Sequence, residues 1–523
     1  MSDCPRPRDG FLRARRVLSL VPGVTGDAIW WQDGQIRAVG FARELARRVP
    51  SRVPRYEHPG ALVTPGFVDG HTHFAMWATS RRQVRLAGAR SRAEALERIA
   101  AGTATRGWVL GHGWDANHWE APPDRFVLDR VQRLPVFLTS LDVHAAWVNS
   151  TALALARIGR DTPDPVGGRI VRDASGEPTG ILLERAVELV TPHLPEPAPT
   201  DLADAVRDAQ REAHRLGITG IHDVETPSAL AAFRALEQAG ELRLRVLFHP
   251  PVAELPALVR HGVQSGQGTA WLRLGGVKLF LDGSLGSRTA WMLEPYEDGR
   301  DAGMPVATEG EARAAMQAAA AAGIACTVHA IGDAAVRRAL DLIAELPRVG
   351  LPHRIEHFQC VHPADLKRAG ELGVVSSMQP AHLLVDIPLA ERHWGRRSRG
   401  AFAFRSLLDQ GTILAFGSDV PVASLDPREG VWAAMERVSG DGSPPRGWYP
   451  EERLGFEAVV RAYTQGNAFA AGVADRRGTL APGMDADLVA WDVDPAVEHD
   501  IASAFRVARA RLTVVAGEVV MQA

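Results

Sequence analysis

Short apolar segments alternate with helical segments along the central part of the chain, and no other feature limits its possible folds as strongly. Eight segments between residues 60 and 422 have the apolar runs and flanking turn residues of β-strands, and most are separated by segments with helical periodicity. Strands that alternate with helices pair in parallel, and eight of them typically form a (β/α)8 barrel of the α/β class. The eight segments are GALVTPGFVDGHTHF, ITGIHDV, LRLRVLFHP, LRLGGVKLFLD, GIACTVHAIG, HRIEHFQ, GVVSSMQ and GTILAFGSDVPV.

The two ends of the chain have a different pattern, with short apolar runs separated by Gly or Asp turns. It appears in residues 11–63 and again near the C-terminus in ADLVAWDVD and RARLTVVAGEVVMQ. Neither end contains enough strands to form a stable sheet alone. We therefore expect residues 1–64 and 470–523 to form one small composite β-sandwich domain beside a barrel of residues 65–469.

Residues 75–217 separate the first predicted barrel strand from the second, which is far longer than an ordinary loop. The segment has strand patterns of its own in GWVLGHGW and LPVFLTSLDVH, together with helical stretches. We expect it to be an inserted, cap-like segment.

The composition excludes several classes of partner. A hydrophobic content of 46% and a net charge of −3 are typical of a globular protein and give no reason to expect binding to nucleic acid or an anionic membrane. No run of about 18 apolar residues is present to span a bilayer, and the N-terminus lacks the apolar core of a signal peptide. Three scattered cysteines favour a cytoplasmic protein. The sequence is compatible with a homodimer.

Residues that bind metals lie where the predicted barrel strands end, which is the face on which such barrels carry active sites. His71 and His73 are two positions apart on the first strand, so they share a face. His329, His357 and Asp419 close the fifth, sixth and eighth strands. Singly, each histidine also fits a core position, and the aspartate fits a turn or a helix cap. Together they predict a metal site, because zinc binds imidazole nitrogen and carboxylate oxygen.

Several motifs resemble the amidohydrolase superfamily: GFVDGHTHF, the strand-end histidines His329 and His357, FGSDVP and the closing GTLAPGMDADLVAWD. Four more, VKLFLDGSLGSRTA, HAIGDAAV, RIEHFQ and YPEERL, resemble the branch of amidohydrolase family 3 that includes N-substituted formamide deformylases. The resemblance extends over nearly the whole chain. It implies a metal-dependent hydrolase barrel with a flanking composite β-domain.

Lys278 is unusual, because Lys278 and Lys367 are the only lysines among 59 basic residues. The resemblance implies that a lysine on the fourth strand reacts with carbon dioxide, and that its carbamate bridges two metals. Arginine cannot replace it, since the guanidinium stays protonated, whereas a buried lysine amine can lose its proton. A structural ion pair, a free ammonium that holds substrate, and a one-metal site with an unmodified lysine are the alternatives.

The resemblance also implies how the ligands are shared between one or two divalent metals, with zinc expected. The first metal is expected on the His-x-His pair and the aspartate, the second on the other two histidines, and the carbamylated lysine between them. Asp419 is further expected to take a proton from the metal-activated water and deliver it to the leaving nitrogen. The implied ligands are His71, His73, Lys278, His329, His357 and Asp419.

Six more residues are candidates for binding substrate. Two lie just after the lysine, two lie at strands of the insert, and two lie at the second and seventh barrel strands. Loop hydrogen bonds, buried structural histidines and core tryptophans explain the same residues about equally well. The candidates are Asp282 and Arg288, Trp114 and His144, and His222 and His382.

These observations predict a metal-dependent hydrolase that cleaves a non-peptide C–N amide bond of a small molecule, such as an N-substituted formamide or another N-acyl compound. The same site would also serve cyclic amides, carbamates, esters or a deamination, and the sequence does not separate these substrates. A non-catalytic, metal-stabilised sensor or regulator is the alternative from another class. It predicts a damaged ligand set, whereas the set in this chain is complete.

Overall fold

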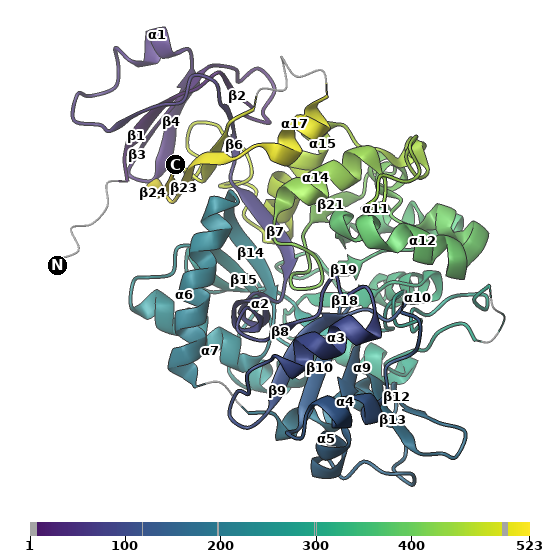
Figure 1. Cartoon of the computed structure of the whole chain (residues 1–523). Helices are drawn as coiled ribbons and strands as arrows, with labels where there is room; N and C mark the ends of the chain where they lie inside the picture. The colour runs from purple at the N-terminus through teal and green to yellow at the C-terminus, as the bar shows by residue number, and fades with distance from the viewer. Residues whose placement is uncertain (1–7, 118, 196–197, 298, 300, 494–499) are drawn as a thin grey trace.

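The computed structural model describes most of the chain, and its strands form the five sheets considered below. Cys4 lies outside the described residues. Figure 1 shows the purple strand β7 (Phe67–Thr72) beside the teal strand β14 (Ile218–Val224), with helices around them. The described residues are 8–117, 119–195, 198–297, 299, 301–493 and 500–523.

Two all-parallel sheets contain the eight expected barrel segments. The first has the order β16-β15-β14-β7 and the second the order β17-β18-β19-β20-β21. Every residue of β14 is buried, as expected for a parallel strand that is covered on both faces. The remaining strands are β15 (Arg245–His249), β16 (Leu272–Leu274), β17 (Val277–Phe280), β18 (Cys326–Ala330), β19 (Arg354–His357), β20 (Val375–Met378) and β21 (Ile413–Phe416).

Isolated bridges connect the two parallel sheets at two places. One isolated parallel bridge joins Thr72, at the end of β7, to Val420, just beyond β21, and another joins Pro251 to Lys278. Because all of these pairings are parallel, the carboxyl ends of β7, β19 and β21 lie on one side of the molecule. The residues that follow those ends can therefore converge.

The predicted fourth strand is divided in the structure. Its first part, β16, pairs with β15, whereas its second part, β17, pairs with β18 of the other sheet. Two glycines at the break allow a close approach that no side chain would permit. A Cβ on Gly275 would lie 2.4 Å from Cε1 of His249, and a Cβ on Gly276 would lie 2.6 Å from the carbonyl oxygen of Ala325.

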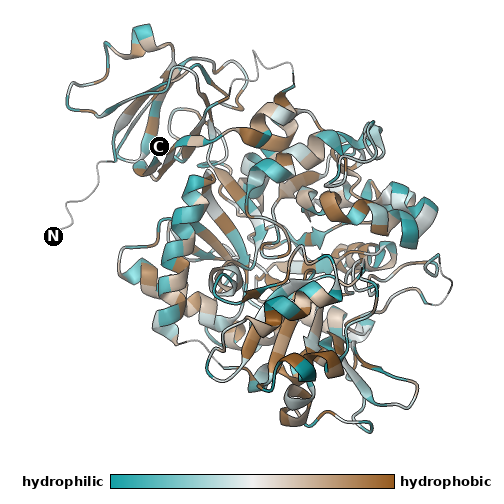
Figure 2. Ribbon diagram, viewed as in Figure 1, coloured by the Kyte–Doolittle hydropathy of each residue, from teal (hydrophilic) through white to brown (hydrophobic). Residues whose placement is uncertain are grey.

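Helices surround the parallel sheets. The longest, α6 (Pro199–Arg215), alternates between teal and brown in Figure 2, as expected for a helix with one polar and one apolar face. Among the described residues, no helix has the length and apolar character needed to cross a bilayer. The others are α2 (Phe74–Ser80), α7 (Pro227–Gln238), α8 (Leu255–Arg260), α9 (Glu309–Ala321), α10 (Asp333–Ala344), α11 (Arg368–Leu372), α12 (Leu383–Trp394), α13 (Phe404–Asp409), α14 (Pro427–Glu436), α15 (Phe456–Arg461) and α16 (Asn467–Ala470).

The predicted insert contains a sheet of its own, with the order β12-β13-β11-β10-β9-β8. Its last helix, α6, does not belong to that unit, because Val206 and Ala213 pack in the same buried cluster as Phe74 of α2 and Phe233 of α7. The elements of the separate sheet are β8 (Val84–Arg85), α3 (Arg92–Ala100), β9 (Val109–Trp114), α4 (Arg125–Val131), β10 (Val136–Ser140), β11 (Ala145–Val148), α5 (Ser150–Leu155), β12 (Gly168–Arg172) and β13 (Pro178–Glu184).

The two ends of the chain share one sheet, in the order β2-β6-β22-β23-β24, because β6 pairs antiparallel with β22. A second sheet, β4-β3-β1-β5, is made from the N-terminal part alone. The elements are β1 (Gly10–Arg13), β2 (Arg16–Val17), β3 (Ala28–Gln32), β4 (Gln35–Gly40), α1 (Ala42–Leu45), β5 (Arg55–Glu57), β6 (Leu62–Pro65), β22 (Leu488–Trp491), α17 (Ile501–Val507), β23 (Ala510–Val515) and β24 (Glu518–Gln522).

Candidate functional site

His71 and His73, at the carboxyl end of β7, both turn one ring nitrogen toward Asp419. Nδ1 of His71 contacts the Glu356 carboxylate, and Nδ1 of His73 lies 2.7 Å from the carbonyl oxygen of Val224. Both nitrogens face acceptors and so must donate, which leaves Nε2 of a neutral ring with a free lone pair. Those two Nε2 atoms lie 3.4 Å and 3.3 Å from Oδ1 of Asp419.

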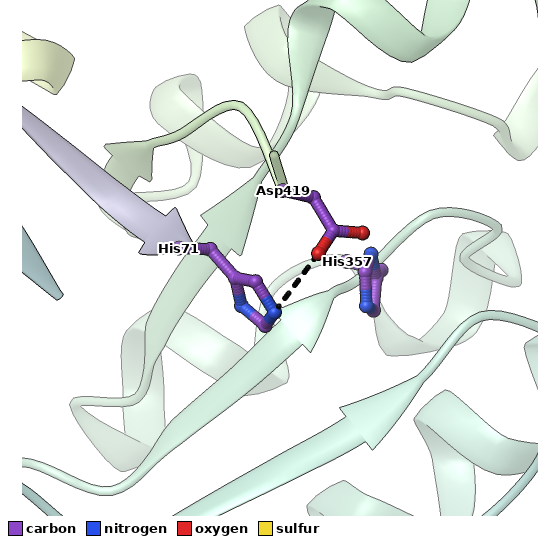
Figure 3. Close-up of side chains that lie close together, drawn as sticks. All are labelled: His71, His357 and Asp419. Carbon is purple, nitrogen blue, oxygen red and sulfur yellow. Dashed lines mark ion pairs between the residues drawn. The ribbon is translucent and has the colours of Figure 1, made fainter. Parts of the chain in front are cut away.

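His71, His357 and Asp419 form a buried group that fits a metal ion (Figure 3). Each offers one ligand atom, and these atoms lie within 4.8 Å of one another. His71 Nε2, His357 Nδ1 and Asp419 Oδ1 are buried and have no hydrogen-bond partner among the described residues. Burying an unpaired polar atom costs roughly 1–3 kcal/mol, so three of them directed at one point favour a site for a divalent cation.

The protonation states also suit a cation. Burial, with the Lys278 ammonium nearby, lowers the pKa of His71 to about 4, so its ring is neutral at pH 7. Burial alone would raise the pKa of Asp419, but the neighbouring imidazoles of His71 and His73 hold it below its ordinary value. His71 therefore presents a neutral imidazole and Asp419 an ionised carboxylate, which are the forms that bind metals. Burial alone would lower the pKa of His73, but Asp419 raises it above its ordinary value.

The backbone is strained where the site residues lie. His357 has φ of 69° and Asp419 has φ of 60°, both in the left-handed region that few residues other than glycine adopt. The Asp419 turn is fixed by its own N–H, which donates to the carbonyl of His71 over 2.7 Å. Such conformations cost about 1–3 kcal/mol and tend to occur at functional sites.

His329 and Lys278 lie next to this group without belonging to it. The ring centroids of His329 and His357 are 4.5 Å apart, and Nε2 of His329 lies 3.1 Å from the carbonyl oxygen of Gly283. Lys278 is 3% exposed, and its Nζ lies 4.8 Å from the ring centroid of Phe280. Burial lowers the pKa of Lys278 to about 8, although the carboxylates of the site partly oppose this shift. Their roles as ligands stay predictions.

Sequence reasoning missed the charged pair that holds His71 in place. Glu356 precedes His357, and its carboxylate accepts from His71 and from the guanidinium of Arg354, two residues earlier on the same strand face. Burial alone would raise the pKa of Glu356, but Arg354 and His71 hold it well below its usual range. Two oppositely charged residues within the buried segment RIEHFQ were the available signal.

A cavity of about 390 Å³ opens above His357 and Asp419. Three of the six predicted substrate residues line it: Trp114 and His144 from the insert, and His382 just before α12. The indole N–H of Trp114 donates to the carbonyl of Leu138 over 2.9 Å, so this tryptophan is also part of the core of the insert. The volume lies within the range of small-molecule sites.

His144 brings the insert into contact with the predicted metal ligands. Its Nδ1 lies 2.8 Å from the Glu184 carboxylate, and its ring centroid is 5.1 Å from that of His329. Burial alone would lower the pKa of His144, but Glu184 and Asp142 raise it to about 9. This ring is therefore protonated at pH 7.

The other three candidates do not line the cavity. Asp282 accepts hydrogen bonds from three backbone N–H groups, which occupy its carboxylate and fix the loop after β17. The Arg288 guanidinium lies 5.9 Å from the Tyr296 ring centroid. Nδ1 of His222 accepts from Arg354 over 2.8 Å. The roles of all six residues in substrate binding stay predictions.

Comparison with protein families gives one match over most of the chain: a model of an amidohydrolase family matches residues 59–521. Three relatives have similar extents. Protein LONG AFTER FAR-RED 3 of Arabidopsis thaliana is 32% identical over 89% of this chain and 85% of its own. The putative amidohydrolase YtcJ of Bacillus subtilis is 31% identical over 91% and 92%. The N-substituted formamide deformylase of Arthrobacter pascens is 28% identical over 90% and 90%.

Solved structures are similar over equally long stretches. A metal-dependent hydrolase from Pyrococcus horikoshii has a TM-score of 0.76 at 28% identity, covering 94% of this chain and 98% of its own. An adenosine deaminase from Xanthomonas campestris with bound zinc has a TM-score of 0.56 at 17% identity, covering 99% and 93%. The similarity to the adenosine deaminase concerns the fold alone.

Proposed function

The chain belongs to the amidohydrolase family and is an enzyme, and from this premise we propose that it is a metal-dependent hydrolase of small molecules that cleaves a non-peptide C–N amide bond. One observation carries the proposal: His71, His357 and Asp419 direct unpartnered buried atoms at one point below a cavity. An N-substituted formamide or another N-acyl compound is the substrate class to test first, since one relative over 90% of this chain is a deformylase of such compounds.

We assign the metals by the chemistry of the side chains. His71, His73 and Asp419 would hold one divalent ion, for which zinc fits the nitrogen and oxygen donors, and His329 with His357 would hold a second. A bound metal supplies Lewis acidity and lowers the pKa of water. The two parallel sheets, joined by two isolated bridges, would act as one (β/α)8 barrel that presents these ligands at its carboxyl end.

Lys278 would carry the bridging group. The lone pair of its neutral Nζ attacks the carbon of carbon dioxide, an N–C bond forms and one proton leaves, which gives a carbamate anion. A pKa of about 8 leaves a useful fraction of the amine neutral near pH 7.5. Lysine modified in this way would add a carboxylate-like ligand where an arginine adds only positive charge.

Two residues of the chain would manage protons and charge during the reaction. Oδ1 of Asp419 faces the histidine pair, so Oδ2 is left to take a proton from water and return it to the leaving nitrogen. His144 lines the cavity with Nδ1 engaged by Glu184, which leaves its Nε2–H as a donor for the substrate carbonyl oxygen. Catalysis would therefore use groups from both the parallel sheets and the insert.

Rival functions share the same site. Cyclic amides, carbamates, esters and deamination substrates need the same metal chemistry, so only a substrate panel separates them. A non-catalytic sensor or regulator would tolerate loss of ligands, whereas the histidines and Asp419 are all present and adjacent.

A chelation experiment tests the proposal. The purified full chain is assayed against N-alkyl formamides, other N-acyl amines and one member of each rival class, before and after metal removal and after zinc is restored. We expect hydrolysis of at least one open-chain amide that is lost on chelation and recovered with zinc, and that falls at least about 10³-fold in Asp419→Asn. Hydrolysis that survives chelation, or a preference for another class, contradicts it.

A further inference from the structure

We propose that the cavity selects a cationic substrate, an N-acyl amine whose amine portion carries a second, protonated nitrogen; this inference rests on the proposed function. Besides Asp419, the cavity is lined by four carboxylates, and within the described part of the chain no lysine or arginine lines it. A concave site lined by one sign of charge attracts the opposite sign and repels its own. The four residues are Asp115, Asp142, Asp386 and Glu429.

Two of these carboxylates have one oxygen that accepts no hydrogen bond from the described residues. Oδ2 of Asp386 accepts from the Gln359 side-chain amide over 2.8 Å, while no donor among the described residues reaches its Oδ1. Oδ1 of Asp115 accepts from the backbone N–H and from the side-chain amide of Asn117, and its Oδ2 likewise has no donor within the described ranges. Asp386 lies on α12 and Asp115 just after β9, so two separate elements present free acceptors to the cavity.

Asp142 supplies a fixed negative charge in the same cavity. Its Oδ2 accepts from the hydroxyls of Ser284 and Ser287 over 2.6 Å and 2.7 Å, and its Oδ1 accepts from the hydroxyl of Ser140, so both oxygens are already occupied. Burial, together with the charges of Asp142 and Asp115, raises the pKa of Asp386 to about 7. A cation between these side chains would relieve that crowding of like charges.

The one protonated side chain of the cavity wall, among the residues described, does not cancel this charge. His144 is paired with Glu184 at 2.8 Å and lies beside Asp142, so two carboxylates already balance one imidazolium. Asp115 and Asp386 remain without an ion-pair partner among the described residues, whereas Glu429 lies near Arg428 and Arg506. The charge of Asp419 is left out of this comparison, because a metal would neutralise it.

A ligand is indicated independently by His382, which also lines the cavity. Its side chain is 10% exposed, and Nε2 is buried with no hydrogen-bond partner among the described residues. That nitrogen lies 3.8 Å from Oδ2 of Asp419, at the reacting end of the site. Asp386 follows four residues later, on α12, so both side chains line the same part of the cavity. We therefore expect a short aliphatic linker between the amide and the second nitrogen of the substrate.

Binding of matched amines tests this selectivity without any turnover. Zinc-loaded full-length protein is titrated by calorimetry at pH 7.5 with 1,5-diaminopentane, pentylamine and 5-aminopentanoate. We expect the diamine to bind about tenfold more tightly than pentylamine, with the carboxylate compound weakest. Asp386→Asn should reduce the advantage of the diamine to about twofold or less, because the amide keeps the Gln359 contact but loses the charge. Asp115→Asn gives a second variant from another element.

The control is Asp161→Asn, which removes the same charge from an exposed position of the insert. Equal affinity for all three compounds, or an advantage of the diamine that survives in both cavity variants, overturns the inference.

Hydrolysis of the three corresponding N-formyl compounds separates this inference from the proposed function. We expect kcat/KM to be highest for the formamide with a free amine and lowest for the one with a carboxylate. Equal kcat/KM values for the three compounds contradict the selectivity for a cationic substrate, but they remain consistent with the proposed hydrolase function. If none is hydrolysed while the diamine still binds selectively, the selectivity stands and the formamide assignment is overturned.

Discussion

At the scale of single residues, Lys278 offers the most direct test of the metal assignment. Replacement by arginine keeps the positive charge but removes the amine that can form a carbamate. We expect the metal content measured on protein made with zinc and bicarbonate to fall from two ions per chain to one or none. Lys367→Arg is the matched control, because Lys367 is the other lysine and its side chain is 66% exposed. One ion per chain in both wild type and Lys278→Arg would contradict the bridging carbamate and indicate a one-metal enzyme.

His144 gives a pH dependence at the same scale. Its pKa rises from 6.5 in the unfolded chain to about 9 in the folded protein, so the contact with Glu184 contributes stability that is complete below pH 6.5 and is lost as pH rises through about 9. We expect His144→Gln to lower the free energy of unfolding by roughly 1–3 kcal/mol at pH 6 and by much less at pH 10. Urea unfolding at both pH values measures this. An equal loss at both values would show that the ring contributes through packing rather than charge.

At the scale of elements, the sequence predicts where the strands are better than how they pair. The spacing of apolar residues and the flanking turn residues locate all eight segments. The ends of these segments then indicate where His71, His357 and Asp419 lie. The break between β16 and β17 was not predicted, because Gly275 and Gly276 matter only through the neighbours that approach them. For the same reason Asp282 and Arg288, close to the lysine in sequence, do not line the cavity: Asp282 accepts from the backbone N–H of Ile331, which is distant in sequence, and Arg288 lies beside the Tyr296 ring, and no local pattern reveals either contact.

The glycine break is itself testable. In Gly275→Ala the new Cβ would lie 2.4 Å from the His249 ring, so the strand junction must shift. We expect a loss of about 1–3 kcal/mol in the free energy of unfolding, measured by chemical denaturation. Gly310→Ala in α9 is the control, because nothing lies within 4 Å of its Cβ and alanine favours the helix. If both variants were equally stable, the close approach would not be what divides the strand.

At the scale of the whole molecule, the metal ligands connect parts of the chain that share few backbone hydrogen bonds. His71 lies on β7 of the four-stranded sheet, while His357 and Asp419 lie at the ends of β19 and β21 of the five-stranded sheet. Among the described residues, one isolated bridge, Thr72 to Val420, joins the strands at this edge, together with the backbone hydrogen bonds donated by His73 and Asp419. A bound cation would therefore link the four-stranded sheet to the five-stranded sheet.

Metal removal should then loosen this junction before the rest of the molecule. A ligand at 100 times its dissociation constant stabilises the folded state by about 2.7 kcal/mol, so we expect chelation to lower Tm by a few degrees and zinc to restore it. Hydrogen exchange should quicken most in β7 and in residues 417–420, because the repulsion among buried site groups is no longer balanced. Strands β9 and β10 of the insert serve as the internal control, since their pairing does not involve the ligands. Uniform loss of protection across all of these strands would mean that the metal stabilises the chain globally instead of joining its two parallel sheets.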